Sequence, residues 1–177
     1  VAIVGAGPVG LCAAMSAVAL GASKVIVVDK VAARLTEAEK FGAIGVNSSE
    51  TDGTDAVLDL SDWRGADVVV DAVGHPSALL AAIPLLRAGG TLSIPGVYTE
   101  DTIDGFPFSE LYLKGIKVEM GVSHITEYMD EVIGLMTAGK LHPSAMISHR
   151  MGLSEAADAY KLFEAREAMK ILLDPAR

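Results

Sequence analysis

The sequence predicts an α/β protein with a doubly wound, six-stranded parallel sheet and a smaller C-terminal α/β extension. Two observations support this prediction. Short apolar segments alternate along the chain with helical stretches, and strand–helix–strand repetition implies parallel strands joined by right-handed crossovers. The strand candidates are nearly continuous apolar runs, which is typical of strands that helices bury on both faces. We expect these strands at residues 1–4, 24–29, 43–46, 67–71, 90–95 and 115–120.

The helices expected between these strands have recognisable ends. Pro8 stands at the first helical position, where its missing N–H is not needed, and Gly21 follows the helix as a left-handed stop. A second helix covers residues 32–40 and ends at Gly42, and a third apolar helix covers residues 77–86.

The pattern changes after the sixth strand. An amphipathic helix at residues 127–137 precedes a strand near Ile147, and a helix at residues 154–164 precedes a final apolar run at residues 171–173. Ser154 stands where its hydroxyl would cap the second of these helices. We therefore expect a distinct C-terminal unit beyond the sheet.

The composition excludes several classes of protein. The 177 residues include 23 acidic and 14 basic side chains, and this net charge of −9 argues against nucleic acid or an anionic membrane surface as a partner. A single cysteine excludes a disulfide framework and a four-thiolate zinc site within the chain. No apolar run approaches about 18 residues, and no leader precedes a cleavage site. We expect a cytoplasmic protein with no membrane segment.

The first strand runs directly into a glycine-rich turn that opens a helix. The expected coenzyme-binding residues of this turn are Gly5, Gly7, Pro8, Val9 and Gly10. The first glycine makes the sharp turn, the second lets a pyrophosphate approach the backbone, and the third lets helix and strand pack closely. The free N–H groups and the positive dipole end of the helix then face the phosphates. This context predicts a dinucleotide site of the Rossmann type.

The second strand ends at an acidic residue, Asp29, nineteen positions beyond Gly10. A carboxylate there accepts the ribose hydroxyls of an adenosine and repels a 2′-phosphate, which favours NAD over NADP. Lys30 leaves an opening for NADP, because a basic side chain partly compensates a phosphate. Arg34 lies where it either covers the adenosine edge or remains a solvated surface residue.

The first thirty residues alone suit a flavin enzyme equally well, because flavoprotein hydroxylases open with a similar glycine turn and an acid after the second strand. The second half of the sheet decides between them. Residues 67–74 form a buried strand that ends at a small-residue loop, and residues 86–97 form a glycine turn followed by another strand. Two further strand ends therefore lie on the edge where a doubly wound sheet binds its ligand.

The order of these motifs resembles the coenzyme-binding half of the zinc-dependent medium-chain alcohol dehydrogenases. The likeness covers essentially the whole chain. The matching segments are GAGPVG at 5–10, VVD at 27–29, DAVG at 71–74, RAGG at 87–90, IPGV at 94–97 and the tail at 147–175.

The resemblance implies further coenzyme-binding residues. In this family, the residues that match Ala72, Val73 and the following Gly74 pass beneath the coenzyme riboses. Lys170 matches a basic position that reaches the pyrophosphate. The alternative for each is ordinary packing at a strand end or, for Lys170, a solvated side chain. The positions that flank the nicotinamide in this family match Pro95, Gly96, Val97 and Met120.

The same resemblance implies that the catalytic zinc belongs to a preceding domain that this chain lacks. Zinc needs three or four convergent ligands, and the chain offers one cysteine and four scattered histidines. We expect Cys12 to be a small buried hydrophobe, and His75 and His124 to be structural or surface residues. We therefore assign no metal ligand and no catalytic residue in this chain.

The chain opens at Val1, without Met and inside an apolar run, so we expect a piece of a longer protein. Residues 1–124 would form the NAD-binding domain, and residues 125–177 would pack back on the absent catalytic domain. The parent would transfer hydride between NAD and a small alcohol or aldehyde. Two alternatives remain, a zinc-free quinone-reductase relative that uses NADPH and a non-catalytic dinucleotide-binding or redox-sensing module.

We also expect a homo-oligomer, a dimer or a tetramer. In the family that the chain resembles, the fifth and sixth strands and their neighbouring loops often form the dimer contact. Residues 98–114 are therefore the candidate interface, with exposed aromatic and apolar side chains expected at Phe106, Phe108, Leu111 and Tyr112. The alternative is a loop that folds onto its own domain.

Overall fold

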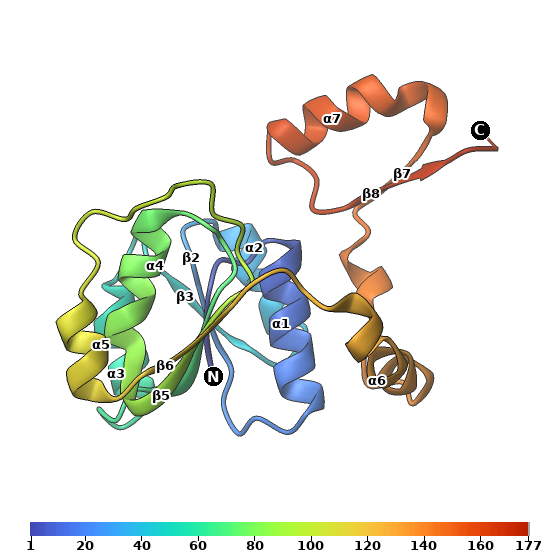
Figure 1. Ribbon diagram of the computed structural model, residues 1–177. Coiled ribbons are helices and arrows are strands. Elements are labelled where there is room, and N and C mark those ends of the chain that lie inside the picture. Colours follow the sequence, from blue (N-terminus) through green and yellow to red (C-terminus); the bar gives the residue numbers. More distant parts are fainter. Residues whose placement is uncertain (177) are drawn as a thin grey trace.

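A computed structural model of the chain, described here for residues 1–176, has a six-stranded parallel sheet in the order β3-β2-β1-β4-β5-β6 (Figure 1). This order confirms the predicted doubly wound class. Each strand pairs in parallel with its neighbours. The strands are β1 (Ala2–Val4), β2 (Ile26–Asp29), β3 (Ile44–Asn47), β4 (Ala66–Asp71), β5 (Leu86–Ile94) and β6 (Lys117–Met120).

Helices cover both faces of the sheet (Figure 1). One face carries α1 (Pro8–Ala19) and α2 (Ala32–Glu39), and the other carries α3 (Gly53–Leu60), α4 (Pro76–Ala82), the 3-10 helix η1 (Ile83–Leu85) and α5 (Phe108–Lys114). Successive strand residues alternate between these layers. Ile3 and Val27 pack with the first pair of helices, whereas Ala2 and Val4 pack with the second group. Because neighbouring residues of a strand face opposite layers, a central strand needs apolar residues at consecutive positions to fill both layers.

Two helices were not expected from the sequence. The helix α3 begins where the carboxylate of Asp52 accepts hydrogen bonds from the backbone N–H groups of Thr54 at 2.7 Å and Asp55 at 3.2 Å. The helix α5 ends at Gly115, which adopts a left-handed φ of 62°. Both helices are short and bury few side chains, so their apolar periodicity is weak.

The segment between α4 and β5 also differs from the expectation. The predicted helix at residues 77–86 stops at Ala82, η1 follows it, and β5 already begins at Leu86. The register between β4 and β5 shifts between Ala66 and Val68, so the glycine pair before residue 91 lies within an irregular part of the strand.

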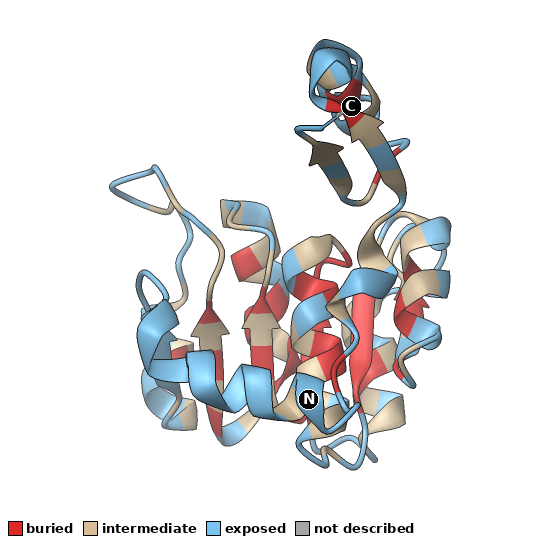
Figure 2. Ribbon diagram, turned by 90° about the vertical axis from the view of Figure 1, so that its right-hand side faces the viewer, coloured by how far each residue is buried: buried red, intermediate tan, exposed pale blue. Residues whose placement is uncertain are grey.

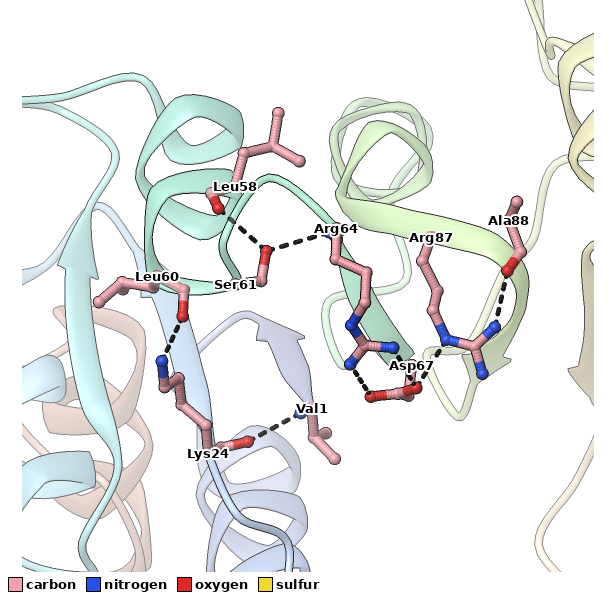
Figure 3. A network of polar contacts seen from close by, with 10 residues as sticks. Val1, Lys24, Leu58, Leu60, Ser61, Arg64, Asp67, Arg87 and Ala88 are labelled. Carbon is pink, nitrogen blue, oxygen red and sulfur yellow. Dashed lines mark hydrogen bonds and ion pairs between the residues drawn. The ribbon is translucent and has the colours of Figure 1, made fainter.

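A polar network ties the amino ends of the strands together (Figure 3). Arg64 donates two hydrogen bonds to the Asp67 carboxylate, at 2.9 Å and 2.6 Å, and the Nε of Arg87 donates a third at 2.6 Å. These arginines hold the pKa of Asp67 well below its usual range. Lys24 donates to the carbonyl oxygen of Leu60 nearby. The network lies at the edge of the sheet opposite to the strand ends that bind ligands in this class of fold.

The C-terminal part forms a separate small unit. It contains α6 (Ile125–Thr137), the 3-10 helices η2 (Pro143–Met146) and η3 (Leu153–Glu155), and α7 (Ala156–Glu164). The strands β7 (His149–Gly152) and β8 (Ile171–Asp174) pair in parallel as a second sheet. In Figure 1, α7 and these two strands stand apart from the large sheet, and Figure 2 shows that they are mostly exposed or intermediate.

The predicted cap at Ser154 was wrong. Ser154 lies inside η3, and the backbone N–H of Gly152 instead donates a 2.7 Å hydrogen bond to the carboxylate of Glu155. The acid one position later therefore performs the capping, because the turn begins earlier than the apolar pattern indicates.

None of the helices within residues 1–176 combines the length and apolar character needed to cross a lipid bilayer.

Candidate functional site

A groove of about 650 Å³ opens at the carboxyl ends of β1, β2 and β4. Because β2 and β4 lie on opposite sides of β1, the groove lies where the order of the strands reverses, the usual ligand position in open α/β sheets. Seven of the sequence-predicted site residues line it: Gly5, Gly7, Asp29, Lys30, Arg34, Ala72 and Val73. The structure thus brings the ends of the first, second and fourth strands to one site.

The glycine turn between β1 and α1 has the geometry that its sequence predicts. Gly5 adopts a φ of +98°, and a Cβ on Gly10 would lie 1.8 Å from the carbonyl oxygen of Gly5. Any larger residue at position 10 would therefore push the helix away from the turn. In contrast, a Cβ on Gly7 would meet no protein atom within 4 Å, so space remains beside this residue in the groove.

The amino end of α1 is free to bind an anion. Gly7 is its N-cap and Pro8 opens the helix, and neither a side-chain cap nor an acidic residue occupies the first turn. The N–H groups of that turn lack partners within the helix. Val9 is exposed beside them. A phosphate or pyrophosphate is the ligand class that such a twelve-residue helix favours at its amino end.

The Asp29 carboxylate is held by two backbone groups. Its Oδ2 accepts a hydrogen bond from the N–H of Ala6 at 2.7 Å, and its Oδ1 accepts one from Val31 at 2.8 Å. These bonds connect the glycine turn to the loop after β2 and fix the orientation of the carboxylate. A carboxylate has about four acceptor positions, so about two remain for donors from a ligand.

A second carboxylate, Asp71, organises the loops after β4 and β5, and its role was missed in the sequence. Asp71 is 0% exposed. Its Oδ1 accepts hydrogen bonds from the N–H groups of Val73 at 3.0 Å and Gly74 at 3.4 Å, and its Oδ2 accepts the hydroxyl of Tyr98. Burial and the neighbouring Asp71 raise the pKa of Tyr98 above its ordinary value. An acid that ends a buried apolar strand was the available signal for this role.

The loops after β4 and β5 also pack backbone against backbone. A Cβ on Gly74 would lie 2.5 Å from the carbonyl oxygen of Val97, and a Cβ on Gly96 would lie 2.4 Å from the backbone nitrogen of Gly74. Only glycine permits this approach. Pro95 and Val97 flank the contact, and Val97 is among the exposed large hydrophobic residues. These residues border the groove without lining it.

The remaining predicted residues lie further out. Met120 ends β6, pairs in register with Ile94 and is 70% exposed. Lys170 precedes β8, its backbone bonds to Ser148, and it lines neither the groove nor the smaller cavity beside it. It nevertheless lies close enough to α1 for its charge to act on Cys12.

The expectation that Cys12 is buried was wrong, because this residue is exposed. Its Sγ lies 3.9 Å from the Sδ of Met146 in the C-terminal unit. Desolvation raises the pKa of the thiol, and the charge of Lys170 opposes this rise. The core-facing positions of α1 are Leu11, Ala14 and Met15, so Cys12 points to the side of the helix.

The histidine next to the groove has the structural role that we expected. The Nδ1 of His75 accepts a 3.2 Å hydrogen bond from the N–H of Ser77 and so caps α4. Across residues 1–176, no three His, Cys, Asp or Glu side chains converge closely enough to hold a metal ion. The side chains described here thus do not fit a catalytic zinc.

The groove also contains residues that the sequence did not point out. The side of the groove near Asp29 is lined by residues that follow β3 and open α3, and by one residue from the loop after α7. These residues are Ser48, Asp52, Gly53, Thr54 and Arg166. For Ser48, Asp52, Gly53 and Thr54, the available sequence signal was Asp52 as the N-cap of a helix. No local pattern in the sequence indicates Arg166.

The candidate interface at residues 98–114 is partly exposed. Phe108 and Tyr112 lie on the outer side of α5 and are 72% and 77% exposed, and Phe106 is partly exposed. Leu111 faces inward and belongs to the core, so its predicted exposure was wrong. The helical turn of α5 explains the difference, because residues one position apart on a helix face different directions.

Comparisons with known proteins identify the family of this chain. A family model described as "Zinc-binding dehydrogenase" matches residues 8–138. An uncharacterized zinc-type alcohol dehydrogenase-like protein of Bacillus subtilis is 32% identical over 99% of this chain and 52% of its own length. A probable zinc-binding alcohol dehydrogenase of Mycobacterium tuberculosis is 35% identical over 99% of this chain and 45% of its own length.

Solved structures show the same fold. The alcohol dehydrogenase from Thermus sp. ATN1 superposes with a TM-score of 0.91 and 35% identity over 97% of this chain and 51% of its own. A dehydrogenase from Escherichia coli, solved with NADH, shares the fold with a TM-score of 0.85 at 24% identity over 97% of this chain and 51% of its own. The chain thus spans about half the length of the curated relatives that it matches. The motifs, the fold and the family match agree, and the chain belongs to the zinc-binding dehydrogenase family.

Proposed function

We propose that this chain binds NAD(H) in the groove and supplies the coenzyme platform of an enzyme that transfers hydride between nicotinamide and a small alcohol or aldehyde. The observation that supports it most is the pairing of an uncapped helix amino end with the oriented Asp29 carboxylate, at the point where the strand order reverses. The relatives described above are alcohol dehydrogenases, and this supports the reaction class.

We assign each part of a dinucleotide to residues that line the groove or lie around it. The amino end of α1 would hold the pyrophosphate, and Asp29 would accept the adenosine ribose hydroxyls. Ala72 and Val73 would lie beneath the riboses. Pro95, Gly96, Val97 and Met120 would flank the nicotinamide, and Lys170 would reach the pyrophosphate from the C-terminal segment. The coenzyme, when bound, supplies the hydride acceptor or donor.

The contribution of this chain is to orient its ligand. Asp71 and Tyr98 hold the loops after β4 and β5 together, and the contact between Gly74 and Gly96 leaves these loops little room to separate. A rigid floor under the nicotinamide restricts the coenzyme to orientations from which hydride can reach a substrate carbon. Its apolar side chains, including Val73 and Val97, would exclude water from that side.

We further propose that residues 1–124 are the coenzyme domain and that residues 125–177 pack against a catalytic domain outside this chain. The helix α6 supports this division, because it buries none of its own residues among those described here. Zinc-dependent activation of the alcohol would come from that other domain. The exposed side of α5 supports a homo-oligomer, and we place the protein in the cytoplasm.

The binding proposal is tested best at Gly7. Because a Cβ there meets no protein atom within 4 Å and φ is −75°, Gly7→Ala should leave the fold intact. The added methyl would occupy the space where the pyrophosphate approaches, so NADH affinity should fall at least about tenfold. Titration of NADH fluorescence with the full chain measures this change.

Gly134→Ala is the matched control, since Gly134 lies on α6 and its Cβ would also meet no atom within 4 Å. This variant should bind NADH like the parent chain. If the parent chain binds no NADH at millimolar concentration, or if both variants bind equally well, the proposed site is wrong.

A further inference from the structure

Arg166 has an unusual backbone conformation for its side chain. It follows α7 with a φ of 62°, and within residues 1–176 only two other non-glycine residues, Asp62 and Trp63, have a positive φ. The N–H of Arg166 donates to the carbonyl oxygen of Phe163 at 3.1 Å, and the N–H of Glu167 donates to Leu162 at 3.0 Å, so this turn closes the helix. Glycine is the residue that such a left-handed helix stop favours. An arginine in this position points to a role for its side chain.

The side chain of Arg166 has a clear place in the molecule. Arg166 lines the dinucleotide groove, and it also lines an adjoining cavity of about 350 Å³ between α2 and the C-terminal unit. Of the other residues that the structure describes, only Val31 and Arg34 also line both the groove and this cavity. Because both of these residues follow Asp29 by no more than five positions, Arg166 reaches the adenosine end of the groove rather than the nicotinamide end.

Packing holds the C-terminal unit where Arg166 can reach the groove. Met146 and Met169 pack against the core cluster that contains Leu11 and Leu35. The backbone N–H of His142 also contacts the Sδ of Met15 at 3.1 Å. These contacts bring the loop after α7 over the first turns of α2. The proximity of Arg34 and Arg166 thus depends on tertiary packing, across more than 130 positions of sequence.

Basic side chains slightly outnumber acidic ones along the groove. Lys30, Arg34 and Arg166 line it together with Asp29 and Asp52, and each oxygen of Asp29 accepts a backbone hydrogen bond. Asp52 accepts the N–H groups that open α3, and Glu37 and Glu167 line the smaller cavity. None of the ion pairs formed among residues 1–176 involves Arg34 or Arg166. Two guanidinium groups without an acidic partner are suited to bind a phosphate.

We propose that Arg34 and Arg166 bind a 2′-phosphate on the adenosine ribose, so that the chain accepts NADP(H) as well as NAD(H). This specificity rests on the proposed function, because it assigns the phosphate to the same dinucleotide. Asp29 favours a free ribose, and the arginine pair opposes that preference. NADPH should therefore bind within about tenfold of NADH, although the acid after β2 alone would predict its exclusion.

The test compares ligands that differ only in the 2′-phosphate. NADPH and NADH form one pair, and 2′,5′-ADP and 5′-AMP form the other, each titrated calorimetrically into the full chain. Arg166→Gly removes the guanidinium and places the favoured residue in the left-handed turn, so the fold should be retained. It should weaken the binding of NADPH and 2′,5′-ADP about tenfold and change the binding of NADH and 5′-AMP less than about twofold. Arg34→Ala should act in the same direction.

Arg150→Ala is the control, because Arg150 is exposed on β7 and lines neither cavity. It should bind all four ligands like the parent chain. The assignment is overturned if the parent chain binds NADH but not NADPH, or if Arg166→Gly weakens both members of each pair equally. If NADH does not bind either, the proposed function itself has failed and this assignment falls with it.

Discussion

The sheet region, residues 1–120, and the C-terminal region, residues 121–176, bury their apolar side chains very differently. The buried hydrophobic residues of the second region are Leu141, Ala159 and Ala168, and all others lie in the first. The apolar face of α6 is exposed and consists of Ile125, Tyr128, Met129, Val132, Ile133 and Met136. The sheet region therefore completes its own core, whereas the second region leaves a contiguous apolar surface exposed.

The two regions meet through sulfur-containing side chains. Met15 and Cys12 on α1 contact His142 and Met146 of the C-terminal region, and Met169 packs beside them. Methionine fills irregular gaps because its side chain is flexible. Because nearly all of the buried hydrophobic residues lie in the sheet region, the two regions should contribute unequally to the stability of the chain.

The largest expected difference comes from core substitutions. Leu92→Ala on β5, at 0% exposure, should lower the free energy of unfolding by about 3 kcal/mol, because it leaves a cavity between the sheet and its helices. Ile133→Ala on α6, at 51% exposure, should change it by less than about 0.5 kcal/mol. Urea denaturation measures both. Equal effects would contradict the proposed difference between the regions.

Tyr98→Phe should give the next largest effect. The variant removes a hydroxyl that bonds to the buried Asp71 carboxylate and to the carbonyl oxygen of His75, so it leaves a buried acceptor short of a donor. We expect a loss of about 1.5 kcal/mol. Tyr112→Phe, at an exposed position of α5, is the control and should be neutral. If both variants behave alike in denaturant, the loops after β4 and β5 do not depend on this contact.

Met169→Ala tests the junction between the regions. Because the side chain is partly buried against the core cluster of α1 and α2, its removal should cost about 1 kcal/mol. Hydrogen exchange should quicken at β7 and β8 and stay unchanged at β1 and β4. Uniform acceleration through the large sheet would show that the two regions unfold as one unit.

Asp67→Asn should have the smallest effect, because the network at the amino edge is about half exposed. We expect a loss below about 1 kcal/mol at pH 7. Arg64 and Arg87 hold the pKa of Asp67 below its unfolded value, so this contribution is complete above about pH 5 and is lost as the pH falls below about 4. Denaturation of both proteins across this range should show the difference shrink, and a constant difference would reject the ion-pair origin.

Much of the sheet was predictable because its signals are local. All six strands were placed within a few residues, since each is a short apolar run next to a glycine or a polar turn. The glycine turn was predictable for the same reason, because the residues at positions 5 and 10 answer steric demands within one strand–turn–helix unit. The helices α3 and α5 were missed because each buries a single residue, which leaves no clear periodicity.

The sequence by itself determined the fold class, the dinucleotide turn, the acid after β2 and the family of the protein. Only the tertiary structure decided which distant groups meet. Asp71 bonds to Tyr98 across 27 positions, and Arg166 reaches the end of the groove that Arg34 lines. The physical reason is that backbone conformation depends mainly on neighbours in the chain, whereas the partners of a charged side chain depend on how whole elements pack. The same packing left Cys12 exposed and turned Leu111 inward.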